Sequence, residues 1–116
     1  MAYDEALADR IREVVREEPG RAEKRMFGGL AFLVEGHLAV SASGHGGLLL
    51  RVDPTRTDSL VDPPAVDRFV MRGRAMDGWL RVDTAVVADD DVLREWVGLG
   101  VAHVRSLPPK PRTLDM

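Results

Sequence analysis

One run of the sequence, residues 25–34, constrains the fold more than any other. It reads Arg-Met-Phe-Gly-Gly-Leu-Ala-Phe-Leu-Val and is followed at once by Glu35 and Gly36. Successive side chains of a strand point to opposite faces, so a strand at residues 26–34 would be apolar on both faces. Such a strand belongs inside a covered sheet, because a half-solvated strand alternates apolar with polar residues.

Gly28 and Gly29 interrupt this run, and glycine in a strand loses side-chain packing and costs backbone entropy. The pair therefore predicts a β-bulge or a sharp coil of the sheet, with the close approach of a ligand or of a helix as alternatives. Glu35-Gly36 is short enough to form a hairpin turn to a second strand at residues 37–43.

Composition limits the class of protein. The chain of 116 residues suits one domain that folds without metal or disulfide help. It has no Cys, which excludes disulfides and thiolate chemistry and favours a reducing, cytoplasmic location. No apolar run reaches the length of a bilayer span, and the acidic start does not resemble a signal peptide. A net charge of −3 predicts no general attraction to nucleic acid or anionic membranes.

Helical periodicity predicts two long amphipathic helices, at residues 4–18 and 90–106, each preceded by Asp residues that suit an N-cap. A short helix should begin at Pro54, with Asp53 as its cap. The strands expected from alternation and turn residues are 26–34, 37–43, 48–52, 66–72 and 79–83.

The resulting order is α-β-β-β-α-β-β-α. Connections this short favour an antiparallel sheet with helices packed on it, so the predicted fold class is α+β with two layers. We expect one domain at residues 1–106 and a Pro-rich extended tail at residues 107–116. If both long helices cover one face, the other still presents Phe27 or its neighbours, Leu33, Leu49 and Trp79, which predicts a homodimer through that open face or a sheet edge.

No residue pattern predicts a catalytic, cofactor or metal site. The three His have no partner at the spacing of a helical zinc site. Ser41 and Ser43 lie near His45, but the turn that presents a serine nucleophile is missing. The glycines are not followed by the helix and the lysine that hold a nucleotide. We therefore predict that the chain is not an enzyme.

The basic residues between positions 68 and 81 are the best candidates for a binding surface. Arginine suits carboxylates and phosphates, and few acidic residues lie among them. Because the sequence has no helix-turn-helix, zinc finger or RNA-binding aromatic pair, direct nucleic-acid binding is disfavoured and a protein partner is favoured. The candidate interaction surface consists of Arg68, Arg72, Arg74, Trp79 and Arg81.

Four motifs follow one another along the chain: Arg25-Met26-Phe27-Gly28-Gly29 before an apolar strand, Leu49-Leu50-Arg51-Val52, Met76-x-Gly78-Trp79-Leu80, and Trp96-Val97 leading to Ser106-Leu107-Pro108-x-Lys110. In this order they resemble the N-terminal domain of the TfoX/Sxy family. The resemblance covers residues 7–110. It implies the element order given above, arranged as in type III secretion chaperones, and a bacterial cytoplasmic setting.

Full-length members of that family are regulators of natural competence that act as transcription coactivators and carry a further helical domain. The resemblance thus implies a stand-alone N-terminal domain with an interaction role. It supplies no catalytic residues, and the matching positions are expected to be architectural. These positions are Phe27, Gly28, Gly29, Gly78 and Trp96.

The leading hypothesis is a non-enzymatic regulatory or adaptor domain that binds a protein, with the transcription machinery as one candidate partner. Two alternatives stay open. The first is a small-molecule-binding or hydrolytic domain with a pocket near Gly28-Gly29, which a pocket with convergent polar groups would favour. The second is a DNA-associated module, whose affinity would fall steeply with salt.

Overall fold

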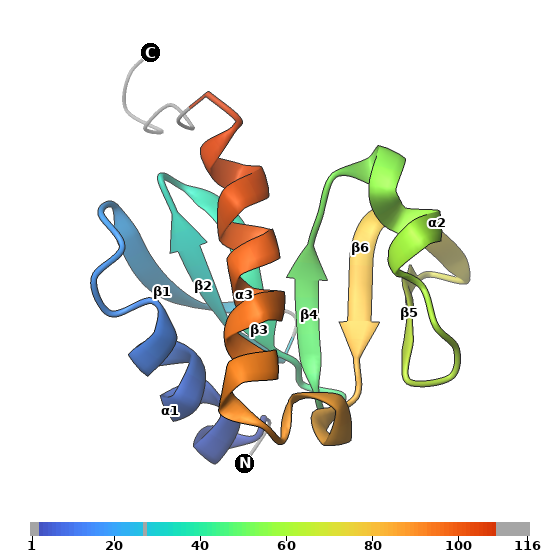
Figure 1. The fold of residues 1–116 in the computed structure, drawn as a ribbon, viewed down its shortest axis with the longest axis horizontal. Helices are drawn as coiled ribbons and strands as arrows, with labels where there is room; N and C mark the ends of the chain where they lie inside the picture. The colour runs from blue at the N-terminus through green and yellow to red at the C-terminus, as the bar shows by residue number, and fades with distance from the viewer. Residues whose placement is uncertain (1–2, 27, 109–116) are drawn as a thin grey trace.

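The computed structural model describes residues 3–26 and 28–108 as one antiparallel six-stranded sheet with helices packed on it (Figure 1). The strand order is β1-β2-β3-β4-β6-β5. The α+β class and the antiparallel sheet are confirmed. The elements are α1 (Glu5–Val14), β1 (Arg21–Met26), β2 (Gly29–Val34), β3 (His37–Ala42), β4 (Leu48–Arg51), the 3-10 turn η1 (Pro54–Arg56), α2 (Thr57–Leu60), β5 (Val66–Met71), β6 (Arg74–Val82), the 3-10 turn η2 (Thr84–Val87) and α3 (Asp90–Arg105).

The single strand predicted at residues 26–34 is wrong. The chain forms two strands there, and Met26 of β1 pairs with Gly29 of β2 across a turn in which Gly28 has φ 77°. The sheet therefore has six strands where the sequence predicted five. Periodicity missed β1 because its residues Arg-Ala-Glu-Lys-Arg are exposed on both faces of an edge strand and so show no apolar alternation.

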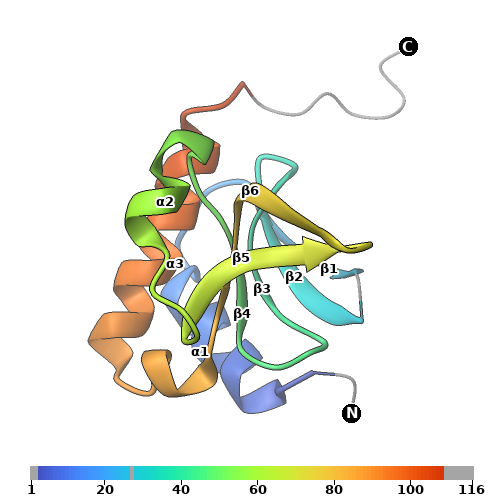
Figure 2. The same ribbon diagram turned by 90° about the vertical axis from the view of Figure 1, so that its right-hand side faces the viewer.

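The helices cover one face of the sheet and enclose the core. Leu7 and Ile11 of α1 are buried in the same cluster as Val97 of α3, Val40 of β3 and Leu50 of β4. Figure 2 shows α2 and α3 on one side of the sheet. The helix predicted at residues 4–18 starts as expected but ends at Val14, and the turn that follows carries the chain to β1.

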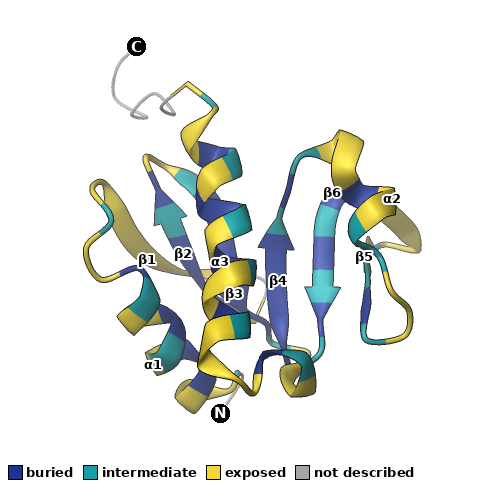
Figure 3. Cartoon of the chain, viewed as in Figure 1, coloured by how far each residue is buried: buried dark blue, intermediate teal, exposed yellow. Residues whose placement is uncertain are grey.

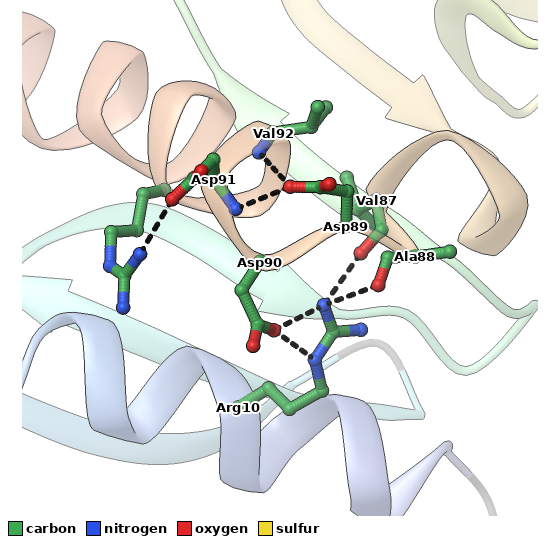
Figure 4. Close-up of polar contacts among 8 residues, drawn as sticks. Arg10, Val87, Ala88, Asp89, Asp90, Asp91 and Val92 are labelled. Atoms are coloured by element: carbon green, nitrogen blue, oxygen red, sulfur yellow. Dashed lines mark hydrogen bonds and ion pairs between the residues drawn. The ribbon is translucent and has the colours of Figure 1, made fainter.

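Side chains at the N-terminus of α3 join it to α1 (Figure 4). The carboxylate of Asp89 accepts the backbone N–H of Asp91 at 2.8 Å, which is the cap predicted from the Asp triplet. Arg10 of α1 donates to the carbonyl of Val87 at 2.7 Å and to the carboxylate of Asp90 at 2.8 Å. A charged side chain therefore fixes the start of α3 against α1.

The central strands β2, β3 and β4 are buried along most of their length (Figure 3), so the face opposite the helices is less exposed than the sequence predicted. Leu49 is only 4% exposed, and Leu33 and Trp79 are half-buried. The register places Arg81 directly opposite Leu49, and the alkyl part of a long arginine side chain covers apolar surface. Among the described residues, Val70 is the large apolar residue that is exposed to solvent, with an exposed fraction of 59%.

The chain just after α3 remains in contact with the domain. Leu107 is half-buried and packs against the core, and the carbonyl oxygen of Pro108 lies 2.7 Å from Nε2 of His37. The rest of the tail predicted at residues 107–116 lies outside the described residues, as does Phe27.

Candidate functional site

All five residues of the predicted interaction surface lie on the hairpin formed by β5 and β6. The connection predicted at residues 73–78 is wrong, because β6 already begins at Arg74. Arg72 and Gly73 alone form the turn, with φ 53° and 77°, as a two-residue turn of type I′ requires. Because β4 pairs with β6, the hairpin folds back so that β5 becomes an edge strand.

The outer part of this hairpin extends beyond the rest of the sheet. The pairing of β4 with β6 ends at Trp79, whereas the pairing of β5 with β6 continues to Met71 and Arg74. We call residues 69–77 the hairpin arm. Figure 2 shows the end of β5 pointing away from α2 and α3. A two-stranded projection of this kind presents side chains and strand edges to other molecules.

The base of the hairpin arm is held by Gly78 and Thr57. Gly78 has φ 86°, its N–H donates to Oγ1 of Thr57 at 2.8 Å, and its carbonyl accepts the N–H of Val52 at 2.9 Å. A β-carbon at Gly78 would lie 3.1 Å from Cγ of Pro54. The backbone at Gly78 thus bends the strand at a point that a larger residue would strain.

Replacement of Thr57 by Val is expected to destabilise the domain. The Thr57 side chain is buried, and its hydroxyl donates to the carbonyl of Pro54 at 2.8 Å while accepting from Gly78. Valine keeps the shape but leaves the buried N–H without an acceptor, which costs about 1–3 kcal/mol in the free energy of unfolding. Urea unfolding measures this loss. Thr84→Val, at an exposed position, is the control and should match the wild type.

Two arginines of the predicted surface are engaged within the domain. Nε of Arg68 donates to Asp77 at 2.7 Å, and its Nη2 contacts Asp58. These hydrogen bonds to Asp77 and Asp58 raise the pKa of Arg68. Arg81 contacts Asp83 and donates to the carbonyl of Pro64 at 2.9 Å. Their ion pairs leave both guanidinium groups partly neutralised by neighbouring carboxylates.

The other two arginines, Arg72 and Arg74, are exposed at the tip of the hairpin arm. Neither forms an ion pair with any residue that the structure describes. They border a shallow groove of about 520 Å³. The groove is lined by Met71, Arg72, Arg74, Ala75, Met76 and Asp77. With the exposed Val70 beside it, the tip combines free positive charge with apolar surface.

Trp79 lies further along β6, and the side chain of Arg51 contacts its ring. The guanidinium carbon of Arg51 lies 5.3 Å from the centre of the Trp79 ring, and the two residues are opposite each other in the register of β4 and β6. This is a cation–π contact. Sequence reasoning missed Arg51, and it missed the roles of Thr57 and Val70. Pairing the predicted strand at residues 48–52 with the one at residues 79–83 would have placed Arg51 beside Trp79.

The space beside Gly28-Gly29, where the alternative hypothesis placed a pocket, is occupied by backbone. A β-carbon at Gly29 would lie 2.3 Å from the carbonyl oxygen of Ala42, and one at Gly44 would lie 2.6 Å from the carbonyl oxygen of Gly28. Close approach of two backbones therefore explains Gly29 and Gly44, and the positive φ of the hairpin turn explains Gly28.

His103 on α3 is the histidine whose environment shifts its titration. Burial lowers its pKa, the positive charge of Arg51 and the neighbouring His37 act in the same direction, and the carboxylate of Asp53 opposes them.

The described residues contain no group of three or more His, Cys, Asp or Glu side chains that could hold a metal ion. No described helix is both long enough and apolar enough to cross a bilayer.

The lowered pKa of His103 predicts weaker stability in acid. The unfolded chain binds a proton below about pH 6.5, whereas the folded chain resists it, so stability is present above that pH and falls as the pH decreases. His103→Gln should flatten the decrease in the thermal midpoint between about pH 8 and pH 5. His45→Gln, at an exposed turn, is the control. Equal slopes for wild type and His103→Gln would contradict the assignment.

A known family model covers most of the elements described above. The TfoX N-terminal domain family model matches residues 14–104, which is most of the chain. The chain therefore belongs to the TfoX N-terminal domain family, which is associated with competence regulation. Comparisons with curated proteins and with solved structures gave no match.

Proposed function

We propose that the chain is a non-enzymatic regulatory adaptor that acts by binding a protein partner through the β5–β6 hairpin. Membership of a family associated with competence regulation supports the regulatory role. The observation that carries the choice of surface is the hairpin arm, which presents Arg72 and Arg74, without an ion pair to any described residue, beside the exposed Val70. The proposed partner is a protein of the bacterial cytoplasm, and a component of the transcription machinery is the first candidate.

Affinity capture from an extract of the native cell tests this proposal. The bait is the full chain as wild type, as Arg72→Glu/Arg74→Glu, and as Arg16→Glu/Arg94→Glu. The last pair changes the net charge by the same amount at exposed positions on or next to the two long helices. We expect at least one protein, identified by mass spectrometry, to be retained by wild type and control and lost from the arm variant. Retention of the same proteins by all three baits would refute the choice of surface.

Trp79 and Arg81 belong to the same proposed surface, further down the hairpin. Trp79 is half-buried below Arg51, and Arg81 is held by Asp83. A Trp79→Ala/Arg81→Ala bait therefore asks whether the contact extends from the tip of the arm onto the sheet. Loss of the partner from this bait, with an unchanged unfolding curve, would extend the surface to β4 and β6.

Self-association is the second part of the proposal. The homodimer predicted from an open apolar face has less apolar surface to use than the sequence implied, because Leu49 is buried and Leu33 is half-buried. Static light scattering at micromolar concentration decides this point. A single species with the mass of one chain removes the homodimer from the proposal and leaves the adaptor function unaffected.

A further inference from the structure

The two outer edges of the sheet differ in how they are protected. Natural proteins guard an edge strand with charged residues, since unpaired backbone groups can pair with another chain. On β1, the other edge, residues 21–25 are exposed and include four charged side chains among the five residues Arg-Ala-Glu-Lys-Arg. The outer half of β5, Phe69-Val70-Met71, has no charged residue, so this is the less protected edge.

In the inner half of β5, a side chain of the strand and the turn before it form hydrogen bonds with backbone groups. The backbone N–H of Arg68 donates to the Asp67 carboxylate at 2.8 Å. Asp62 and Val66 exchange two backbone hydrogen bonds, at 2.7 and 3.0 Å, which close the turn that leads into the strand. Only the outer half of the strand therefore remains available to another chain.

The geometry of the turn shows which backbone groups of the arm point outward. In a hairpin with a two-residue loop, the closing pair exchanges both hydrogen bonds and the next pair exchanges none. Met71 and Arg74 are the closing pair, so Val70 and Ala75 form the pair without hydrogen bonds. The N–H and C=O of Val70 consequently point away from β6, on the outer edge, and its side chain is 59% exposed.

The charge of the arm favours an acidic occupant over a second copy of the chain. Antiparallel self-pairing about Val70 would place Arg72 of one copy opposite Arg68 of the other, whose charge Asp58 and Asp77 neutralise only in part. Like charges directly opposite destabilise a strand pair. Arg72 and Arg74 have no ion pair among the described residues, so carboxylates on an added strand would find free partners there.

We propose that the outer edge of β5 binds an extended acidic segment of the partner protein, which adds as a strand beside Val70 while its carboxylates contact Arg72 and Arg74. This mode of recognition combines backbone hydrogen bonds, which supply affinity, with side-chain contacts, which supply specificity. The inference rests on the adaptor function proposed above and specifies the chemistry of its partner.

Binding of a synthetic peptide tests this proposal on the full chain. The probe is a fluorescently labelled, terminally blocked peptide of alternating Glu and Val, about six residues long, the usual length of a strand. Fluorescence anisotropy should detect binding to wild type, and amide chemical shifts should change at Val70. The same peptide with N-methylated backbone amides on its pairing edge should bind at least about tenfold more weakly, because it has lost its donors.

Two protein variants separate backbone pairing from charge. Val70→Pro removes the outward N–H without breaking a hydrogen bond to β6, since proline is tolerated where an edge strand faces solvent, and should weaken binding about tenfold. Val70→Ala keeps the N–H and should stay within about threefold of wild type. Arg72→Glu/Arg74→Glu should also weaken binding about tenfold or more, whereas Arg16→Glu/Arg94→Glu should leave it unchanged.

Three outcomes would overturn the inference. They are equal affinity of the normal and N-methylated peptides, competition by duplex DNA at the same concentration, and a light-scattering dimer that dissociates in Val70→Pro. If affinity capture depends on the arm but the two peptides bind alike, strand addition is wrong and the adaptor function stands. If capture does not depend on the arm either, the proposed function fails with it.

Discussion

Gly100→Ala is expected to lower the free energy of unfolding by about 3 kcal/mol, near the upper end of the cost of overpacking a core. Gly100 lies on the buried side of α3. A β-carbon there would lie 2.5 Å from the carbonyl oxygen of Ala39 and 2.7 Å from Cδ1 of Leu50. The first of these atoms belongs to the backbone of β3, which cannot rotate away, so the helix itself must move from the sheet.

Gly98 provides a matched control in the same helix. It is exposed, and a β-carbon there would meet nothing within 4 Å. Gly98→Ala should therefore raise the free energy of unfolding by about 1 kcal/mol, the difference in helix propensity between the two residues. Urea unfolding of the two variants should differ in sign. Equal changes would mean that α3 does not approach β3 as closely as the contact with Ala39 indicates.

Gly29→Val is the second substitution with a large expected effect, a loss of roughly 3–4 kcal/mol. The β-carbon would lie 2.3 Å from the carbonyl oxygen of Ala42 and 3.0 Å from the backbone nitrogen of Gly44. Both atoms belong to the chain at the end of β3, whose position is set by its pairing with β2. Valine would separate these strands within the motif Arg25-Met26-Phe27-Gly28-Gly29, which carries part of the family resemblance.

Ala22→Val tests whether this effect is specific to the site. Ala22 lies on the exposed edge strand β1 of the same hairpin, opposite Leu33. Valine suits a strand, so we expect a change within about 0.5 kcal/mol of wild type. Urea unfolding and amide hydrogen exchange of β2 and β3 measure both variants. Similar stability of Gly29→Val and Ala22→Val would show that the backbone contact between Gly29 and Ala42 is not close.

The elements that were predicted correctly carry local signals. Asp4, Asp53 and Asp89 precede helical segments, and each accepts a backbone N–H in the structure. The turn at Glu35-Gly36 is also as predicted, with φ 52° and 84°. Capping and turn formation depend on residues within a few positions of each other, so a single sequence contains the necessary information.

The elements that were mispredicted depend on partners far away in the chain. β1 is mostly charged and exposed, because it is an edge strand, and its pairing with β2 rather than its own pattern makes it a strand. The sequence did not predict that β6 begins at Arg74. Ala75 and Asp77 give no alternation of apolar and polar residues that would distinguish a projecting two-stranded ribbon from a loop. The hydrogen bond from Gly78 to Thr57 also joins two segments whose proximity no local pattern indicates.

The sequence by itself determined the class of the fold, its helices and their caps, the family, and the arginine-rich segment proposed as a binding surface. Only the tertiary structure decided which cations of that segment are free, because ion pairs with Asp58, Asp77 and Asp83 occupy Arg68 and Arg81 and none among the described residues occupies Arg72 or Arg74. The physical reason is that the charge a residue presents to a partner depends on its neighbours in space, and strand order sets those neighbours.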